Sequence, residues 1–424
     1  MSQNTAGTSE QAAGPAQERN HEAASFTTRI VKHAIDAGIW DAVTPPAQKA
    51  LENYLLVAHV AASPRYAHGH PPVPRWQECA DLMGRYTLVV GSGDYGIYDA
   101  LVHRDAPQAE QHRLDAATHH LVTALQARDP LPAPQIAGGP FVAALGGEYQ
   151  SLIRGRAARA HPQVLAAWRA DITQLLHTML LFRAADFSAF PLALTRSLAE
   201  GATVPAAALH QAAERHGERL PAVLRDRLAQ LMGSPRTADR DELLVLLGAI
   251  EAGNTIGAGL FFRTAALHAH ADEIPDTALP LLDTAGHLAN AAIRIGNDLC
   301  ALTTAGPDES DGSYVWTGLH PTAHPPHAPE DADAVHHIQQ VCTRTQDWLA
   351  NALADAIRAL WHESPWLGAI CCRLSHLGIR TYAVRHYALL TRTQHTNTFD
   401  ELDHPAEHPF LTRCQPDWNP ADRA

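Results

Sequence analysis

Apolar residues recur at helical spacing over most of this chain, and this repeat constrains the fold more than any other feature. Phe26, Ile30, Ala34 and Ala37 follow one another at steps of four and three residues, as on the buried face of a helix. Similar stretches, separated by Pro- and Gly-rich breaks, continue to about residue 392, and none alternates as a β-strand does. The pattern predicts an all-α protein with about ten to twelve helices around a common interior.

The repeat also divides the chain. Residues 1–22 are polar and carry no helical period, so they are expected to form a disordered tail. Residues 23–395 are expected to form a single α-helical domain, in which the charged, Ala-rich segment 188–240 is an insertion. Residues 396–424 contain four prolines and no period, which predicts an irregular C-terminal tail.

Composition excludes several classes of function. The net charge of -13 argues against a nucleic-acid partner. No apolar run approaches about 18 residues, so no stable membrane insertion is expected. The first residues lack the pattern of a secretory signal, and the six cysteines form no CxxC pair. A cytoplasmic protein with reduced thiols is expected.

The stretch Ala291–Ala305, read AAIRIGNDLCALTTA, places Asn297 and Asp298 inside an apolar helix. Asn and Asp are poor residues for a helix interior, because their short side chains compete for backbone hydrogen bonds. Either the helix simply exposes a polar side, or the pair binds a ligand. A second polar stretch facing this one would favour the ligand.

Asp94 and Asp99 supply a second polar stretch, in the sequence DYGIYD. Five residues on a helix separate them by about 140° and a little over one turn, so they can straddle one ligand. Together with Asn297 and Asp298 they would form an oxygen-rich clamp, which suits a hard cation such as Mg²⁺. The alternative is that the two aspartates only mark the end of a helix.

The two stretches together resemble the motifs of class I terpene synthases. The family's first motif is DDxxD or DDxxxD, and Asp94 to Asp99 fits the longer form with Tyr95 at the second Asp. Its second motif is NDLxSxxxE, whose start Asn297-Asp298-Leu299 fits. Thr255-Ile256-Gly257 is similar to the TIG-like turn of the family's kinked helix, upstream of that motif.

The resemblance implies a helical bundle around a central apolar cavity, in which Mg²⁺ binds a prenyl diphosphate. The implied metal ligands are Asp94, Asp99, Asn297 and Asp298. The implied diphosphate contacts are Arg294, one turn before Asn297, with Arg380 and Tyr382 or with Arg385 and Tyr387. Asp94, Asn297, Arg294 and Tyr382 are the candidate catalytic residues.

The chain departs from the family in two places. Ala301 and Ala305 stand where the second motif has Ser and Glu, so two of the three positions that share a helix face carry methyl groups. Glu251 or Ala252 stands where the family has an arginine before the kink. The number of metal ions is therefore not implied.

The resemblance favours a cyclase that ionises a prenyl diphosphate, most readily a C20 diphosphate, with a labdane-type diphosphate as one candidate. Alternatives on the same fold are a prenyl transferase and a prenyl-binding protein without catalysis; a homodimer is left open. A helical scaffold protein would instead place Asp94 far from Asn297. A di-iron protein would need ExxH pairs on facing helices, and these occur only at Glu18/His21 and Glu401/His404, in the predicted tails.

Overall fold

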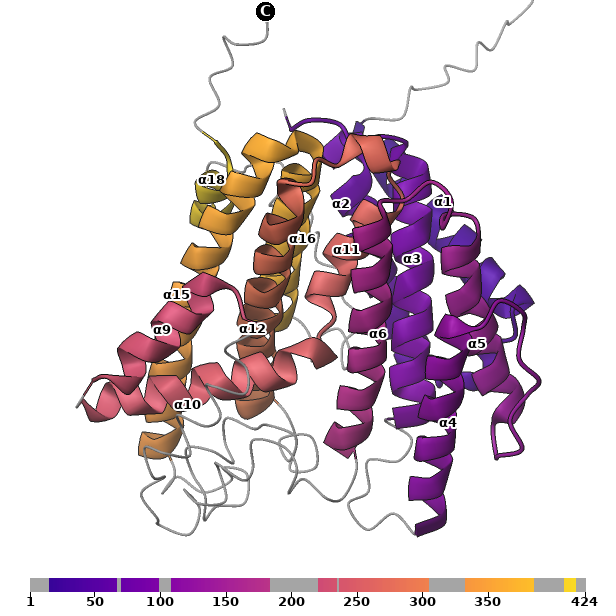
Figure 1. Ribbon diagram of the computed structural model, residues 1–424, viewed down its shortest axis with the longest axis horizontal. Helices are drawn as coiled ribbons and strands as arrows, with labels where there is room; N and C mark the ends of the chain where they lie inside the picture. The colour runs from indigo at the N-terminus through magenta and orange to yellow at the C-terminus, as the bar shows by residue number, and fades with distance from the viewer. Residues whose placement is uncertain are drawn as a thin grey trace, which may run out of the picture.

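The computed structural model describes residues 15–66, 70–98, 108–183, 220–234, 236–304, 332–384 and 408–416. Every element in these ranges is helical, which confirms the predicted class (Figure 1). The α-helices are α1 (Pro15–Asp36), α2 (Pro45–Ala62), α3 (Trp76–Gly93), α4 (Gln108–Gln126), α5 (Gly139–Arg154), α6 (Pro162–Arg183), α9 (Ala222–Met232), α10 (Thr237–Ala252), α11 (Ala258–Leu267), α12 (Ala278–Thr304), α15 (Ala332–Glu363), α16 (Pro365–Val384) and α18 (Pro409–Cys414). The short turns are η1 (Trp40–Ala42), η2 (Pro64–Tyr66), η3 (Asp94–Tyr98), η6 (Gly253–Thr255) and η7 (Ala271–Glu273).

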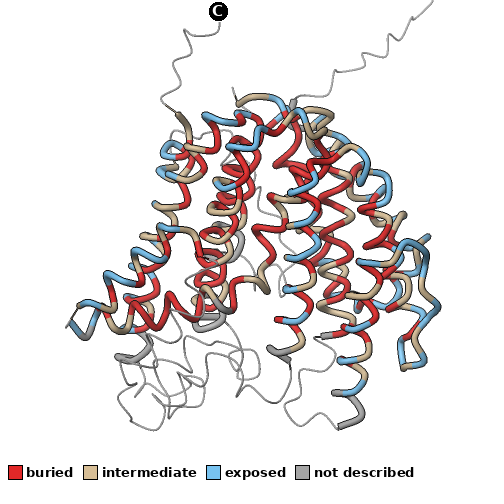
Figure 2. Tube along the Cα trace, viewed as in Figure 1, coloured by how far each residue is buried: buried red, intermediate tan, exposed pale blue. Residues whose placement is uncertain are grey.

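The helices pack their apolar stripes into one contiguous core, and the buried positions follow the inward faces of the upright helices (Figure 2). Helix α12 lies at its centre and packs against α10, α11, α15 and α16. Helix α3 packs against α2, α5 and α11, so α11 lies between α3 and α12. Helix α10 runs across the lower ends of α12 and α15 (Figure 1). No helix within the described ranges is both long and apolar enough to span a bilayer.

Both predicted tails contain ordered helix. Helix α1 begins at Pro15, inside the predicted 1–22 tail, because proline suits a first helical turn and Glu18 complements the helix dipole there. Helix α18 lies inside the predicted 396–424 tail and buries Leu411 and Cys414. Of the predicted 188–240 insertion, residues 188–219 lie outside the described part, and α9 with the start of α10 forms the rest.

Candidate functional site

Three helices that carry or directly precede predicted site residues begin close to Glu273, in η7. Arg75, just before α3, donates to the Glu273 carboxylate with Nη1 at 2.8 Å and also with Nη2. The indole Nε1 of Trp366, in the first turn of α16, donates to the Glu273 carbonyl oxygen at 3.4 Å. Helix α12 starts five residues after Glu273. Helices α3, α12 and α16 therefore start at the same end of the molecule.

All three helices then run to the opposite end, the lower one in Figure 1. At a rise of about 1.5 Å per residue, Asp94 lies about 27 Å from the start of α3, and Asn297 about 29 Å from the start of α12. Helix α6 contacts η3, which Asp94 opens, and also η6, which packs on α12. The two predicted polar stretches therefore lie at a similar distance along the bundle, and α6 links the first of them to the turn that packs on α12.

Asp94 opens η3, a π-helical turn that follows α3 directly. Such turns are rare, and they occur frequently at functional sites. Asp94 is half-buried, and so are Tyr95 and Gly96. Asp99 lies outside the described residues. The first predicted stretch thus begins where α3 ends.

The helix break predicted around Thr255 is present. Helix α10 ends at Ala252, η6 covers Gly253–Thr255, and α11 begins at Ala258. Gly257 joins them with φ +68°, a left-handed conformation that a side chain disfavours. The Thr255 hydroxyl donates to the carbonyl oxygen of Ala252 at 2.7 Å, which stabilises the turn. The turn η6, between α10 and α11, packs against α12.

Arg294 and Asp298, two of the predicted site residues, form a buried ion pair one turn apart on α12. Arg294 Nη2 lies 2.6 Å from Asp298 Oδ1, and Arg294 Nη1 donates to Thr255 Oγ1 at 3.3 Å. The exposed fractions of the two residues are only 7% and 1%. Burial raises the pKa of Asp298 to about 6, although the Arg294 guanidinium acts to lower it. The predicted metal ligand and the predicted diphosphate contact thus bind each other.

The donors for a metal ion are only partly assembled. The second carboxylate oxygen of Asp298, Oδ2, is buried without a hydrogen-bond partner among the described residues. Asn297, next to it, is half-buried. No group of three His, Cys, Asp or Glu side chains in the described ranges is placed to hold a metal ion. Asp298 Oδ2 is a free acceptor of the type that Mg²⁺ prefers.

Asn290 and Asn254 belong to the same polar row, and the sequence interpretation missed them. Asn290 Oδ1 accepts a hydrogen bond from the backbone N–H of Gly259 at 2.9 Å, and its Nδ2 donates to Asn254 Oδ1 at 3.4 Å. Asn290, Arg294 and Asp298 are spaced by four residues, so they share one face of α12. That spacing was a readable signal for Asn290, and Asn254 adjoins the TIG-like turn.

A further arginine, on α11, contacts α12 nearer to the start of that helix. Arg263, on α11, makes ion pairs with Asp171 of α6 at 2.5 Å and with Asp283 of α12 at 2.8 Å. Burial raises the pKa of Asp171, while Arg263 acts to lower it. Burial also lowers the pKa of His287, one turn after Asp283. Two carboxylates, one from α6 and one from α12, therefore already bind Arg263.

The predicted C-terminal contacts are placed only in part. Arg380 and Tyr382 lie in the last turns of α16, at the same end of the bundle as Asp94, and their side chains lie outside the described part. Arg385, Tyr387 and Ala305 are outside it entirely. Ala301 lies on α12. The backbone of Arg380 and Tyr382 thus lies at the end of the bundle where the site is expected.

No family model matches this chain, and a search of curated proteins returns no significant match. The chemistry of the site is therefore inferred from its own residues and their placement.

Proposed function

We propose that this protein is a class I terpene cyclase that ionises a prenyl diphosphate and guides cyclisation of the resulting carbocation. One observation carries the proposal: Asp94, directly after α3, and Asn297, on α12, lie toward the same end of the bundle, and the break before α11 accepts a hydrogen bond from Arg294 of α12 at Thr255. A scaffold protein has no need for two polar stretches at one end of an apolar bundle. We favour a C20 substrate, with a labdane-type diphosphate as one candidate.

Mg²⁺ is the metal that this set of donors would hold. Asp94, Asp99, Asn297 and Asp298 are the oxygen donors, and Asp298 Oδ2 is an acceptor still to be satisfied. Bound Mg²⁺ would neutralise the negative charge that develops on the leaving diphosphate. Arg294, Arg380 and Arg385 would add charge-assisted hydrogen bonds to the diphosphate, and Tyr382 would close on it.

Arg294 has a defined role in this account. Asp298 and Thr255 fix its guanidinium on the face of α12 that meets the helix break. A guanidinium held in place loses less conformational freedom when it binds an anion. If every N–H group of Arg294 is to bind the diphosphate, the hydrogen bond from Arg294 Nη2 to Asp298 Oδ1 would have to break. Asp298 Oδ1 would then be available to the metal.

The interior of the bundle between α3 and α11 is aromatic. Tyr86 on α3 and Phe261 on α11 meet edge to face, with ring centroids 5.0 Å apart. Phe262, which follows Phe261 in the chain, is buried. Excluding water prevents early capture of a carbocation, and aromatic faces attract positive charge. These residues are the proposed wall for the reacting hydrocarbon.

The test is incubation of the purified protein with linear C10, C15 and C20 diphosphates and with a copalyl-type diphosphate, with and without Mg²⁺. Products are identified by gas chromatography with mass spectrometry. We expect a Mg²⁺-dependent hydrocarbon or alcohol that is lost in Asp94→Ala and Asn297→Ala. Formation of a longer prenyl diphosphate from an allylic and a homoallylic substrate would indicate prenyl transfer instead.

The Arg294–Asp298 pair favours a second candidate, a prenyl-binding protein without catalysis. Arg294 already neutralises the charge of Asp298, so this carboxylate does not need a metal ion as its partner. Ala301 and Ala305 stand where the family motif has two metal ligands. This candidate predicts that a prenyl diphosphate binds in calorimetry with little dependence on Mg²⁺ and yields no product. Absence of both binding and product would contradict both candidates.

A further inference from the structure

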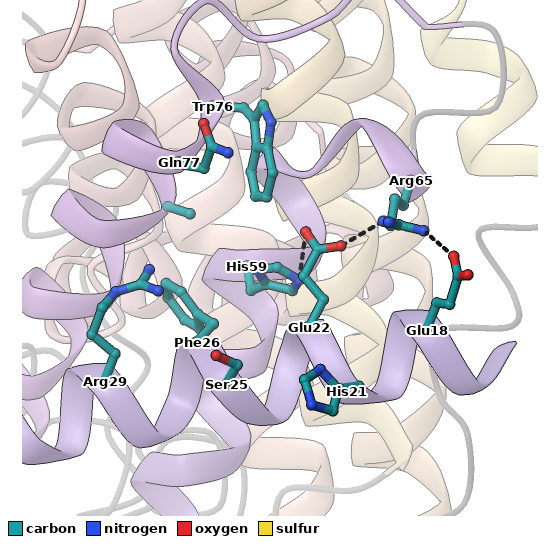
Figure 3. A pocket seen from close by; sticks show the side chains of 11 residues that line it. Glu18, His21, Glu22, Ser25, Phe26, Arg29, His59, Arg65, Trp76 and Gln77 are labelled. Atoms are coloured by element: carbon teal, nitrogen blue, oxygen red, sulfur yellow. Dashed lines mark hydrogen bonds and ion pairs between the residues drawn. The ribbon is translucent and has the colours of Figure 1, made fainter. Parts of the chain in front are cut away.

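A cavity of about 550 Å³ lies between α1, α2 and the start of α3, at the end of the bundle opposite Asp94 (Figure 3). Trp76, the first residue of α3, lines this cavity, whereas Asp94 follows the last residue of α3. The volume is within the range of small-molecule sites. The cavity is therefore separate from the proposed terpene cyclase site.

His59 of α2 is an unsatisfied polar group in the wall of this cavity. Its exposed fraction is 1%, and its ring is held against Phe26 and Trp76, with centroids 5.0 and 5.8 Å away. Neither ring nitrogen has a hydrogen-bond partner among the described residues, and the same holds for Glu22 Oε1. Buried polar atoms are nearly always satisfied, by protein groups or by an ordered water, so unsatisfied ones call for an explanation.

The unsatisfied atoms of His59 and Glu22 point toward each other. His59 Nε2 and Glu22 Oε1 are 3.9 Å apart, which is too far for a hydrogen bond (Figure 3). One oxygen atom placed between them can reach both at ordinary hydrogen-bond distance. Burial, helped by Arg29, lowers the pKa of His59 to about 4, so the ring is neutral at pH 7 and has one donor and one acceptor.

The charged groups around the cavity already have partners. Glu22 Oε2 lies 2.5 Å from Arg65 Nε, and Arg65 also pairs with Glu18 at 3.2 Å. Arg29 pairs with Asp81, and its guanidinium lies over the ring of Phe26 at 5.6 Å. A cationic ligand would be repelled by two arginines, and an anionic ligand by two glutamates. The balance favours a neutral ligand.

We propose that this cavity binds a neutral alcohol with a hydrocarbon body. Its hydroxyl oxygen accepts a hydrogen bond from His59 Nε2–H, and its hydroxyl hydrogen is donated to Glu22 Oε1. Its hydrocarbon body lies along Phe26, Trp76 and Ala80. Among the polar groups of organic ligands, a hydroxyl group is the smallest that satisfies both atoms at once, since an ether cannot donate and an ammonium cannot accept.

The test compares 1-octanol, octyl methyl ether and octylamine on the full chain at pH 7.5, by saturation-transfer NMR and by titration of the protein signals. We expect 1-octanol to bind at least tenfold more tightly than the ether, and more tightly than octylammonium, which is positively charged at this pH. Equal affinity for alcohol and ether would overturn the proposal, because no hydrogen bond would then be involved. Tighter binding of octylammonium would also overturn it, in favour of a cation site.

Two variants locate the binding. In His59→Leu and in Glu22→Ala the preference for alcohol over ether should disappear, whereas it should persist in His120→Leu, which removes a buried histidine of α4 outside this cavity. Glu22→Ala lies on a half-exposed position and should fold even if His59→Leu does not. A preference that survives both variants would show binding elsewhere, with only water between His59 and Glu22. Asp94→Ala should leave alcohol binding unchanged, which separates this test from that of the cyclase.

Discussion

The ion pair between Arg294 and Asp298 is the most consequential contact at the scale of single residues. Both side chains are almost fully covered, so each has lost its hydration, and their mutual attraction offsets that loss. Such a pair contributes little net stability compared with apolar residues of the same size. Removal of one residue of the pair leaves the other charge buried without a partner, whereas replacement of both by apolar residues does not. The pair can therefore be tested by comparing a single variant with a double variant.

Asp298→Ala should lower the free energy of unfolding by about 3–5 kcal/mol, because it leaves the Arg294 guanidinium buried without its carboxylate. The double variant Arg294→Met with Asp298→Leu should recover most of that loss. Denaturant unfolding followed by circular dichroism measures both. The double variant should nevertheless be inactive, if Arg294 contacts the diphosphate.

The control is an exposed ion pair, Lys49 and Glu52, which are 3.0 Å apart on α2. Glu52→Ala should change the free energy of unfolding by less than about 1 kcal/mol, since water screens this pair. If Asp298→Ala proves as mild as Glu52→Ala, the buried pair is not formed in solution.

The role of Asp298 could not be read from the sequence for a specific reason. An arginine four residues before an aspartate can form an internal pair, or both residues can bind the same substrate and metal. Asp94, Asn297 and Asp298 were recognised as unusual because each interrupts an apolar helix. Asn290 shares the four-residue spacing of Arg294 and Asp298, but its partners, Gly259 N–H on α11 and Asn254 on η6, come from other elements and could not be read from the sequence.

At the scale of elements, Glu273 joins the starts of three helices. Hydrogen bonds from Arg75 lower the pKa of Glu273 to about 2, against the opposing effect of burial. A carboxylate whose pKa is lower in the folded state stabilises the fold fully above its unfolded pKa of about 4.5, and this contribution is lost as pH falls toward 2.

Glu273→Gln should therefore be less stable than the wild type by about 1.5–3 kcal/mol at pH 7, the usual range for a charge-assisted contact. The difference should shrink below pH 4.5 and disappear near pH 2. Urea unfolding across this pH range measures it, with Asp272→Asn as the neighbouring control. A difference that stays constant with pH would contradict the role given to the Arg75–Glu273 contact.

Helices α11 and α12 approach each other at two glycines. A Cβ atom on Gly259 would lie 3.1–3.3 Å from three backbone atoms of Gly286, and neither backbone can move aside easily. Gly259→Ala should cost about 1–3 kcal/mol, as overpacking does. Gly147→Ala, at an open position of α5, should instead stabilise by up to about 1 kcal/mol. Thermal unfolding of both variants distinguishes close packing from helix propensity; stabilisation in both would contradict this packing.

The break between α10 and α11 was predictable, because closely spaced glycines flank Thr255 and no helix tolerates them well. The ordered helices in the two predicted tails were not. Pro15 and Glu18 favour the start of α1, but Glu18 and Glu22 also pair with Arg65 on another element. Helix α18 is held by Arg413, which donates to Asp355 and Asn351 of α15. Contacts between residues far apart in the sequence stabilise both helices, and these contacts cannot be predicted from the residues of the helix alone.

At the scale of the whole molecule, the bundle has two chemically different ends. One end gathers the starts of α3, α12 and α16 around Glu273, with the cavity at His59 beside it. The other end carries Asp94, the helix break and Asn297. Helical periodicity was enough to predict the class of fold, and the resemblance was enough to direct attention to one end. The cavity at His59 was not foreseen, because its lining comes from residues of three helices without a shared motif.

The most direct test of the proposed function is Mg²⁺-dependent release of inorganic diphosphate from a linear C20 diphosphate or a labdane-type diphosphate. Asp94→Asn and Asn297→Ala should each lower the rate by about 10²-fold or more, since each removes a group that acts on the developing charge. The double variant should be little slower than the slower single variant, because both residues serve one metal–diphosphate unit. Asp272→Asn should match the wild type. A folded wild-type protein that releases no diphosphate with Mg²⁺, or single variants as fast as the wild type, would contradict the assignment.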